Sequence, residues 1–275
     1  MSAALRWAAE RLAPFHDTAQ LDAEVLLAFA LGKSRAHLHT WPERELDAAT
    51  WHRFQDLVER RCSGEPVAYI TGHREFWSLS LKVTRDTLIP RPETELLVEL
   101  ALTALPADRP GRVADIGTGT GAIALAIARE RPQWTVVATD VSDPALEVAR
   151  GNAEHLGIHN VEFRMGDLCE PLCGEAFDMI VSNPPYVAAA DPHLTQGDVR
   201  FEPTGALVAG PDGLDVIRRL ALCARELLVP GGLLLLEHGY DQAAAVRDLL
   251  SRHGYRDIAS HRDTAGCSRA VSARL

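Results

Sequence analysis

The chain has 275 residues and a mass of 30.0 kDa, enough for one large domain or for a medium domain with a smaller partner. Its formal net charge is −10, and residues 1–85 balance 11 basic against 11 acidic residues, so the remainder carries the whole excess. An acidic C-terminal part repels a phosphate backbone, so direct binding of nucleic acid is not expected.

Membrane and metal partners are also not expected. Apolar residues make up 47% of the chain, but no apolar run is long enough to span a bilayer, and residues 1–13 lack the uninterrupted apolar segment of a signal peptide. The five cysteines form no C-x-x-C pair and have no partners at a zinc-like spacing. These features predict a cytoplasmic protein with reduced thiols. Nothing in the sequence indicates an obligate oligomer, so we expect a monomer.

The first 70 residues are predicted to be helical. Apolar residues recur at helical spacing around Leu5 and Leu12, again around Leu26, and on one face of residues 47–62. We expect residues 1–70 to form a small helical domain that recognises a protein partner. Residues 71–92 combine turn residues with short apolar runs, which indicates a β-hairpin linker.

Residues 93–275 change to an alternation of strand-like and helix-like segments. Such alternation is typical of a parallel sheet with helices on both faces, so the predicted class is a Rossmann-like α/β fold. Residues 255–261 and 269–275 have no helix between them and predict a closing antiparallel hairpin.

A glycine-rich turn follows the first predicted strand of this part. Glycine permits positive φ angles and close approach of a ligand to the backbone. The G-x-G-x-G spacing differs from the dinucleotide motif and there is no P-loop, which disfavours NAD and ATP. S-adenosylmethionine fits better, because it carries no phosphate. The turn consists of Gly117, Thr118, Gly119, Thr120 and Gly121.

Two acids follow the next two predicted strands. Asp140 lies 19 residues after Gly121, close to the spacing of a carboxylate that binds ribose hydroxyls; a helix cap is the alternative. Asp167 follows the third strand and has the chemistry to accept from an adenine amino group, with Leu168 against the ring. The alternative for this pair is an ordinary surface turn.

An Asn-Pro-Pro-Tyr corner follows the strand predicted over residues 177–182. Proline removes ladder donors and restricts the residue before it, so the corner is stiff. Its fixed oxygen acceptors suit a substrate that offers an NH2 group, whereas a plain strand end is the simpler interpretation of the bare triplet. Glu237 and His238 follow a later strand, where a polar strand terminus is the simpler interpretation. The corner consists of Asn183, Pro184, Pro185 and Tyr186.

Together these strand ends resemble those of class I S-adenosylmethionine-dependent amino-methyltransferases. The segments 88–95 (LIPRPETE) and 196–203 (QGDVRFEP) narrow the resemblance to the release-factor glutamine methyltransferases, the PrmC/HemK family. The similarity covers almost the whole chain. It implies an S-adenosylmethionine-dependent methyltransferase domain over residues 93–275.

The resemblance also implies roles for individual residues. The glycine turn and Asp140 hold the methionine and ribose parts of the cofactor, and the corner from Asn183 to Tyr186 holds the substrate amide, with Asn183 close to both. Arg91 and its flanking prolines wall the substrate entrance. Leu168 is a departure, because family members can carry Trp there.

The implied reaction is methylation of the side-chain amide nitrogen (N5) of the glutamine in the Gly-Gly-Gln loop of peptide-chain release factors. Three alternatives remain open at this stage. They are methylation of adenine amino groups in DNA or RNA, methylation of a ribosomal-protein glutamine, and a binding module without turnover.

Overall fold

The protein divides into two compact units. The computed structural model describes residues 1–275, with residues 1–73 and 193–201 in unit 1 and residues 74–192 and 202–275 in unit 2. No pattern in the sequence indicates that residues 193–201, which follow the Asn-Pro-Pro-Tyr corner, belong with the N-terminal helices. No helix has both the length and the apolar character that crossing a bilayer requires.

Unit 1 is a helical bundle around one apolar cluster. Ala8, Leu26, Phe54 and Val58 are fully buried in it, so the apolar faces at helical spacing meet in one core. Asp47 caps the fourth helix by accepting from the Thr50 amide at 2.8 Å. The helices are α1 (Ser2–Leu12), α2 (Ala19–Leu31), α3 (Arg35–Thr40), α4 (Ala48–Cys62) and α5 (Val67–Thr71), with the 3₁₀ turns η3 (Pro192–Thr195) and η4 (Gly197–Phe201).

A buried arginine joins the two stretches of unit 1. The Arg61 side chain is 5% exposed and donates to Asp22 Oδ2 at 2.7 Å and to Asp198 Oδ1 at 2.6 Å. Arg200 donates to the Ser63 carbonyl at 3.1 Å. The segment after the corner is therefore attached to the helical bundle by charged hydrogen bonds.

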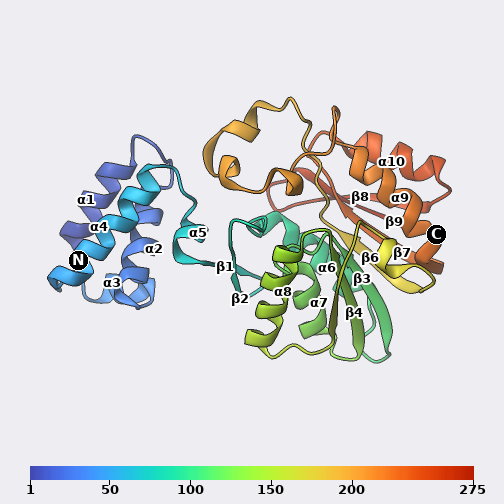
Figure 1. Ribbon diagram of the computed structural model, residues 1–275, viewed down its shortest axis with the longest axis horizontal. Helices are drawn as coiled ribbons and strands as arrows, with labels where there is room; N and C mark the ends of the chain where they lie inside the picture. Colours follow the sequence, from blue (N-terminus) through green and yellow to red (C-terminus); the bar gives the residue numbers. More distant parts are fainter. The chain divides into compact units, whose positions relative to one another are not determined.

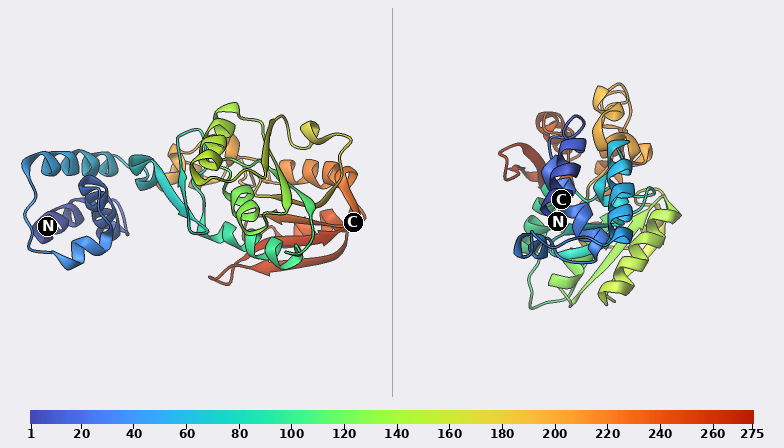
Figure 2. Two further views of the ribbon diagram at one scale, coloured as in Figure 1. Left: turned by 90° about the horizontal axis from the view of Figure 1, so that it is seen from below. Right: turned by 90° about the vertical axis from the view of Figure 1, so that its left-hand side faces the viewer.

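Unit 2 contains a seven-stranded sheet with the order β5-β4-β3-β6-β7-β9-β8. The first five strands of this order are parallel, and β9 pairs with β7 antiparallel. This confirms the predicted Rossmann-like sheet with its closing hairpin, whose strands β8 and β9 are red in Figure 2. The strands are β3 (Gly111–Ile116), β4 (Trp134–Asp140), β5 (Val161–Met165), β6 (Phe177–Ser182), β7 (Leu228–Glu237), β8 (Arg256–Arg262) and β9 (Ser268–Arg274).

Successive residues of each strand point to opposite faces of the sheet, and helices cover both faces. Met179 and Val181 of β6 pack into one apolar cluster with α6 and α7, and Ile180 packs into the other with α9 and α10. Figure 1 shows α9 and α10 on the opposite side of the sheet from α6, α7 and α8. These helices are α6 (Glu95–Ala104), α7 (Ala122–Glu130), α8 (Asp143–Leu156), α9 (Asp215–Leu227) and α10 (Ala243–Arg252).

Short elements precede and interrupt this domain. β1 (His73–Phe76) and β2 (Leu79–Lys82) form the predicted hairpin, and its turn residues Trp77 and Ser78 have positive φ angles of 50° and 57°, as a type I′ turn requires. The helix predicted to begin at residue 93 is preceded by a 3₁₀ turn. The 3₁₀ turns of unit 2 are η1 (Pro92–Thr94), η2 (Glu170–Leu172) and η5 (Thr204–Ala206).

The expectation of five reduced thiols is wrong for one pair. Cys169 and Cys223 form a disulfide, with 6.0 Å between their Cα atoms. They are 54 positions apart in the sequence, and the packing of α9 on the sheet brings them together, which no local spacing indicates. Cys62, Cys173 and Cys267 are free.

Arg61→Ala is expected to destabilise unit 1 strongly, because it leaves the buried carboxylate of Asp22 without its partner. The predicted loss is about 3–5 kcal/mol of unfolding free energy, measured by hydrogen exchange of the α2 and α4 amides in the full-length protein. Arg11→Ala is the control, since the side chains of the Arg11–Glu59 pair are each about half exposed and its removal should cost far less stability. Equal, small losses in both variants would contradict the role of Arg61.

Candidate active site

The order of the parallel strands reverses beside β3. The chain continues from β3 to β4 and β5 on one side, whereas β6 and β7 lie on the other. In sheets of this kind, ligands bind in the crevice at the carboxyl ends of the strands where the order reverses. The pairing of Asp115 with Val181 places the glycine turn directly beside the Asn-Pro-Pro-Tyr corner. The Ser182 hydroxyl strengthens this contact by donating to the Ile116 carbonyl at 2.6 Å.

A cavity of about 300 Å³ opens at this edge. Most of the site residues predicted from the sequence line it, which brings four separate strand ends to one space. Gly121, Pro184 and Tyr186 are predicted site residues that do not line it. The predicted residues that do are Arg91, Gly117, Thr118, Gly119, Thr120, Asp140, Asp167, Leu168, Asn183 and Pro185.

Positive φ angles shape the glycine turn. Gly117 and Gly119 have φ angles of 73° and 56°, and a Cβ on either would meet no atom within 4 Å. Glycine is therefore required there by the backbone conformation, and the space beside it is open to a ligand. The amides of Gly117 and Thr118 both donate to the Thr139 carbonyl at 2.9 Å, which fixes the turn against β4.

Asp115 stabilises the glycine turn from the protein interior. Its side chain is fully buried, and Oδ2 accepts from the Thr118 hydroxyl at 2.6 Å and from the Ala124 amide at 3.1 Å. Oδ1 has no hydrogen-bond partner. Burial raises the pKa of Asp115 to about 7, and the nearby charge of Asp140 adds to this effect.

Asp140 contributes both to the turn and to the cavity wall. Its Oδ2 accepts from the Gly119 amide at 2.9 Å and its Oδ1 from the Ser142 amide at 2.9 Å. Ser142 is the N-cap of α8, accepting from the Ala145 amide, so the cap and the acid are separate residues. A carboxylate accepts about four hydrogen bonds in all. Asp140 therefore keeps acceptor capacity for ligand hydroxyls.

Asp167 and Leu168 form the far wall. Asp167 Oδ2 accepts from Arg219 of α9 at 2.5 Å, and both side chains line the cavity. Leu168 has a φ angle of 51°, a conformation that costs a non-glycine residue about 1–2 kcal/mol. The Thr139 hydroxyl donates to the Leu168 carbonyl at 3.3 Å. The strained backbone turns this aliphatic side chain onto the cavity.

Arg91 is held by a buried carboxylate. Its Nη2 donates at 2.5 Å to Glu202 Oε1, and the Ile89 amide donates to Glu202 Oε2 at 3.1 Å; the Glu202 side chain is fully buried. This pair connects the segment before η1 with the segment after the corner. Arg91 therefore fixes a wall of the cavity through an ion pair.

The corner has a preferred orientation of its amide. Asn183 Nδ2 donates to the Thr94 hydroxyl oxygen at 3.1 Å, and Asn183 Oδ1 accepts no hydrogen bond within the chain. The Tyr186 hydroxyl turns away from the cavity and donates to Glu237 Oε1 at 3.1 Å. The corner thus presents one free amide oxygen to the cavity and anchors its tyrosine behind it.

The structure adds residues to this site that the sequence did not single out. Thr94, Glu202 and Arg219 each contact a predicted site residue, and Glu237 belongs to the same cluster although it was taken for a polar strand end. Thr94 and Glu202 stood inside the two segments that carried the family resemblance. The pairing of Thr94 with Asn183 spans 89 positions, and no local pattern predicts it.

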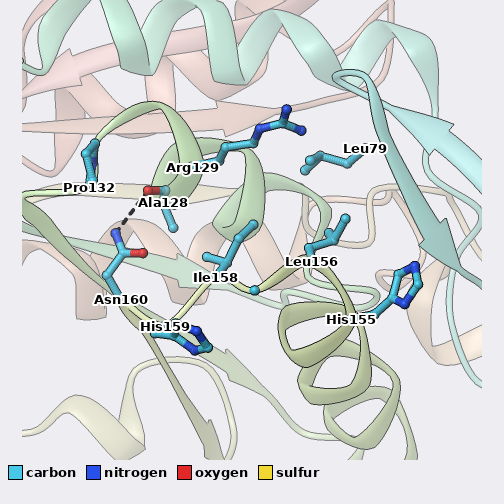
Figure 3. A pocket seen from close by; sticks show the side chains of 10 residues that line it. Leu79, Ala128, Arg129, Pro132, His155, Leu156, Ile158, His159 and Asn160 are labelled. Atoms are coloured by element: carbon cyan, nitrogen blue, oxygen red, sulfur yellow. Dashed lines mark hydrogen bonds between the residues drawn. The ribbon is translucent and has the colours of Figure 1, made fainter.

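A second, larger hollow of about 810 Å³ lies elsewhere on unit 2, at the C-terminal ends of α7 and α8. Figure 3 shows the side chains that line it. Its most buried polar group, the Asn160 amide, donates to the carbonyls of Ala128, Arg131 and Trp134. The hollow contains no carboxylate and none of the strand-end residues, so size alone does not make it the reactive site. No group of three or more His, Cys, Asp or Glu side chains in the protein is arranged to hold a metal ion.

Asp115→Asn is expected to stabilise the protein more at pH 8 than at pH 5. A carboxyl whose pKa rises from 3.8 to about 7 on folding loses stability as the pH rises through this interval, because the fold disfavours its ionised form. Asparagine does not ionise, so the variant escapes this loss. Thermal unfolding of both proteins at the two pH values measures the difference, and a pH-independent difference would show that Asp115 is not the titrating group.

The comparisons with known proteins agree with this geometry. Family models described as the PrmC N-terminal domain and the methyltransferase small domain match residues 3–72 and 93–200. Three relatives are each named release factor glutamine methyltransferase. The protein of Shewanella oneidensis is 48% identical over 98% of this chain and 94% of its own, that of Coxiella burnetii 50% over 96% and 95%, and that of Pseudomonas aeruginosa 55% over 93% and 92%.

Two solved structures share the fold at low identity. A methyltransferase from Pyrococcus furiosus has a TM-score of 0.56 at 19% identity, over 80% of this chain and 98% of its own. A 16S rRNA methyltransferase from T. thermophilus, solved with AdoMet and guanosine, has a TM-score of 0.53 at 20% identity, over 74% and 49%. The structures establish only the methyltransferase fold. From its curated relatives, which match it over nearly its whole length, the chain belongs to the release factor glutamine methyltransferase family.

Proposed function

We propose that this protein transfers the methyl group of S-adenosylmethionine to the side-chain amide nitrogen of the glutamine in the Gly-Gly-Gln loop of peptide-chain release factors. It does so as a monomer in the cytoplasm, in translation termination. The substrate class is supported by the relatives, each of which is named release factor glutamine methyltransferase. The chemistry follows from the corner at the switch point of the sheet.

The free oxygen of Asn183 is the observation that carries the proposal. Its amide nitrogen is bound to Thr94, so Oδ1 is the atom left for a ligand, and the side chain lines the cavity beside the glycine turn. An acceptor fixed in this way recognises an N–H group. A primary amide of glutamine offers two such groups, and the rigid Pro184 carbonyl is our second acceptor.

The cavity suits S-adenosylmethionine. The open space beside Gly117 and Gly119 admits a ligand close to the backbone, Asp140 keeps acceptor capacity for ribose hydroxyls, and Leu168 supplies an apolar surface for a purine. The neighbour from T. thermophilus was solved with AdoMet. Asp167 retains Oδ1 for an amino group while Arg219 occupies Oδ2. When bound, the cofactor supplies an electrophilic methyl group.

The residues of the corner compensate for the low nucleophilicity of the substrate's amide nitrogen. An amide nitrogen shares its lone pair with the carbonyl, and no cysteine, histidine or lysine stands in the corner as a strong base. Asn183 Oδ1 and the Pro184 carbonyl each accept one N–H, which orients the nitrogen and favours a pyramidal geometry. As positive charge develops on the nitrogen, these oxygens stabilise it, and the gain comes from positioning and preorganised dipoles. Tyr186, whose hydroxyl donates to Glu237, supports the corner from outside the cavity.

Labelled methyl transfer tests this function. The purified protein, with methyl-labelled S-adenosylmethionine, is expected to label a release factor and to leave the same factor unlabelled when its loop glutamine is replaced by alanine. Asn183→Ala should reduce the rate at least about 100-fold, the scale for removing one preorganised polar group, while cofactor affinity changes little. Isothermal titration with the cofactor provides that control.

Two results would contradict the proposal. Label on DNA, RNA or ribosomal protein in place of the release factor would show that the protein methylates another substrate. Near-normal turnover of Asn183→Ala would show that the Asn183 amide oxygen is not needed for methyl transfer, even if the release factor is the substrate. Sedimentation of the purified protein checks the monomer.

Unit 1 is our candidate for recognition of the release factor, because it is a separate bundle with a core of its own. Hydrogen exchange of the full-length protein with and without the release factor should show protection in α1–α4 on binding. Protection confined to residues 74–192 and 202–275 would assign recognition to the methyltransferase unit. Deletion of residues 1–70 is a poor substitute, since it also removes the partners of Asp198 and Arg200.

A further inference from the structure

The Asn-Pro-Pro-Tyr corner is held at both of its ends. Ser182, which precedes it, pairs with β7, and its hydroxyl donates to the Ile116 carbonyl at 2.6 Å. At the other end, two polar groups of Tyr186 each have a partner. The hydroxyl donates to Glu237 Oε1 at 3.1 Å, and the main-chain carbonyl accepts from Gln242 Nε2 at 3.0 Å. Gln242 has no part in the function proposed above.

The side-chain amide of Gln242 makes three hydrogen bonds to three different segments. Gln242 is the N-cap residue of α10. Its Oε1 accepts from the Gly239 amide at 2.8 Å, and its Nε2 donates to the carbonyls of Tyr186 at 3.0 Å and Asp212 at 3.3 Å. An amide proton needs an acceptor and a carbonyl needs a donor, so only this orientation of the side-chain amide satisfies all three partners. Gln242 therefore joins the loop after β7, the corner and the loop before α9.

The loop before α9 packs against the same carbonyl. Gly213 has a φ angle of 73°, and a Cβ there would lie 2.3 Å from the Tyr186 carbonyl oxygen and 2.8 Å from Gln242 Nε2. The next residue of the corner strand is also bound, because the Val187 amide donates to the Leu207 carbonyl at 2.8 Å. No side chain fits at Gly213 unless the Tyr186 carbonyl or the Gln242 amide moves.

The two prolines make the corner stiff enough to transmit this constraint. Each proline ring fixes its own φ angle, and Asn183 and Pro184, which each precede a proline, are confined to extended conformations. Few dihedral angles between Asn183 and Tyr186 are then free to absorb a movement. A displaced Tyr186 carbonyl therefore also displaces the Pro184 carbonyl, the second acceptor for the substrate amide.

We propose that Gln242 is a positioning residue for methyl transfer, which holds the Tyr186 carbonyl and thereby directs the acceptors of the corner at the substrate amide. The inference rests on the proposed function for its consequence in catalysis. Gln242 does not line the cavity, so it touches neither substrate nor cofactor in this scheme. A purely structural role would instead confine its contribution to the turn between β7 and α10, where it binds Gly239.

Gln242→Glu distinguishes the two sides of the side-chain amide. The carboxylate keeps an acceptor for the Gly239 amide, but it directs an oxygen in place of NH2 at the carbonyls of Tyr186 and Asp212. We expect kcat to fall at least about tenfold in both Gln242→Glu and Gln242→Ala, since a 1 Å misplacement can cost about 100-fold. KM for the release factor and the cofactor dissociation constant should each stay within about twofold, because the positioned acceptors act in the transition state.

A charge control accompanies this pair of variants. Ala244→Glu adds the same charge at an exposed position in the first turn of α10 and should keep the wild-type kcat. Wild-type kcat in Gln242→Glu, beside a loss in Gln242→Ala, would confine Gln242 to the turn after β7 and overturn the proposal. An equal loss in Ala244→Glu and Gln242→Glu would overturn it too, since charge alone would then explain the effect.

Gly213→Ala tests the Tyr186 carbonyl from its other side. The added Cβ must displace this carbonyl or Gln242 Nε2, so kcat should fall to a similar degree, and adding Gln242→Ala should lower it little further. Gly231→Ala is the matched control, because Gly231 has a φ angle of 79° but no atom within 4 Å of an added Cβ. Equal losses of kcat in the two glycine variants would contradict the proposal.

Hydrogen exchange without substrate separates this inference from the proposed function. The Val187 amide should exchange at least about tenfold faster in Gln242→Glu than in the wild-type protein, whereas the Gly119 amide, bound to Asp140, should be unchanged. If exchange accelerates but no release factor is methylated, the positioning of the corner stands and the proposed function fails. If the release factor is methylated with the wild-type kcat in both Gln242 variants, the positioning role fails and the function stands.

Discussion

The parallel pairing of β3 with β6 is the constraint on which the site depends. Its register sets Gly117 beside Asn183, and the pairings of β3 with β4 and of β6 with β7 extend the same edge to Asp140 and Glu237. None of these residues needs its neighbour in order to reach this position. The backbone ladder brings them together, and the side chains then complete the cavity through hydrogen bonds such as those from the Gly119 and Ser142 amides to Asp140.

The segment that leaves the corner belongs to both units in turn. Residues after Tyr186 pass through unit 2, enter unit 1 at residue 193, where Asp198 binds Arg61, and return at Glu202, which holds Arg91 and the Ile89 amide. A continuous stretch of chain thus connects the corner, an anchor in the helical bundle and a wall of the cavity. Each anchor is a charged hydrogen bond within its own unit, with the Glu202 side chain fully buried and the Asp198 side chain partly exposed.

Much of the fold and part of the site could be predicted from the sequence because they depend on local chemistry. The period of the apolar residues predicted the sheet and the bundle, and glycine spacing and proline chemistry located the turn and the corner. The contacts of Thr94 with Asn183 and of Arg219 with Asp167 span 89 and 52 positions and depend on packing alone. The same holds for the Cys169–Cys223 disulfide, since odd, scattered cysteines give no indication of their partner.

Glu237 is another residue of this edge whose surroundings depend on packing and not on local sequence. At the end of a buried strand an apolar residue is less costly than a carboxylate, so strand chemistry alone does not predict a carboxylate at this position. Burial raises the pKa of Glu237 to about 7, and it also keeps water from competing for the Tyr186 hydroxyl that donates to Glu237 Oε1. A weak amide nucleophile gains nothing from a nearby base that cannot reach it, but it gains from an acceptor that cannot turn over. The Thr94 hydroxyl oxygen, which accepts from Asn183 Nδ2 at 3.1 Å, supplies that restraint.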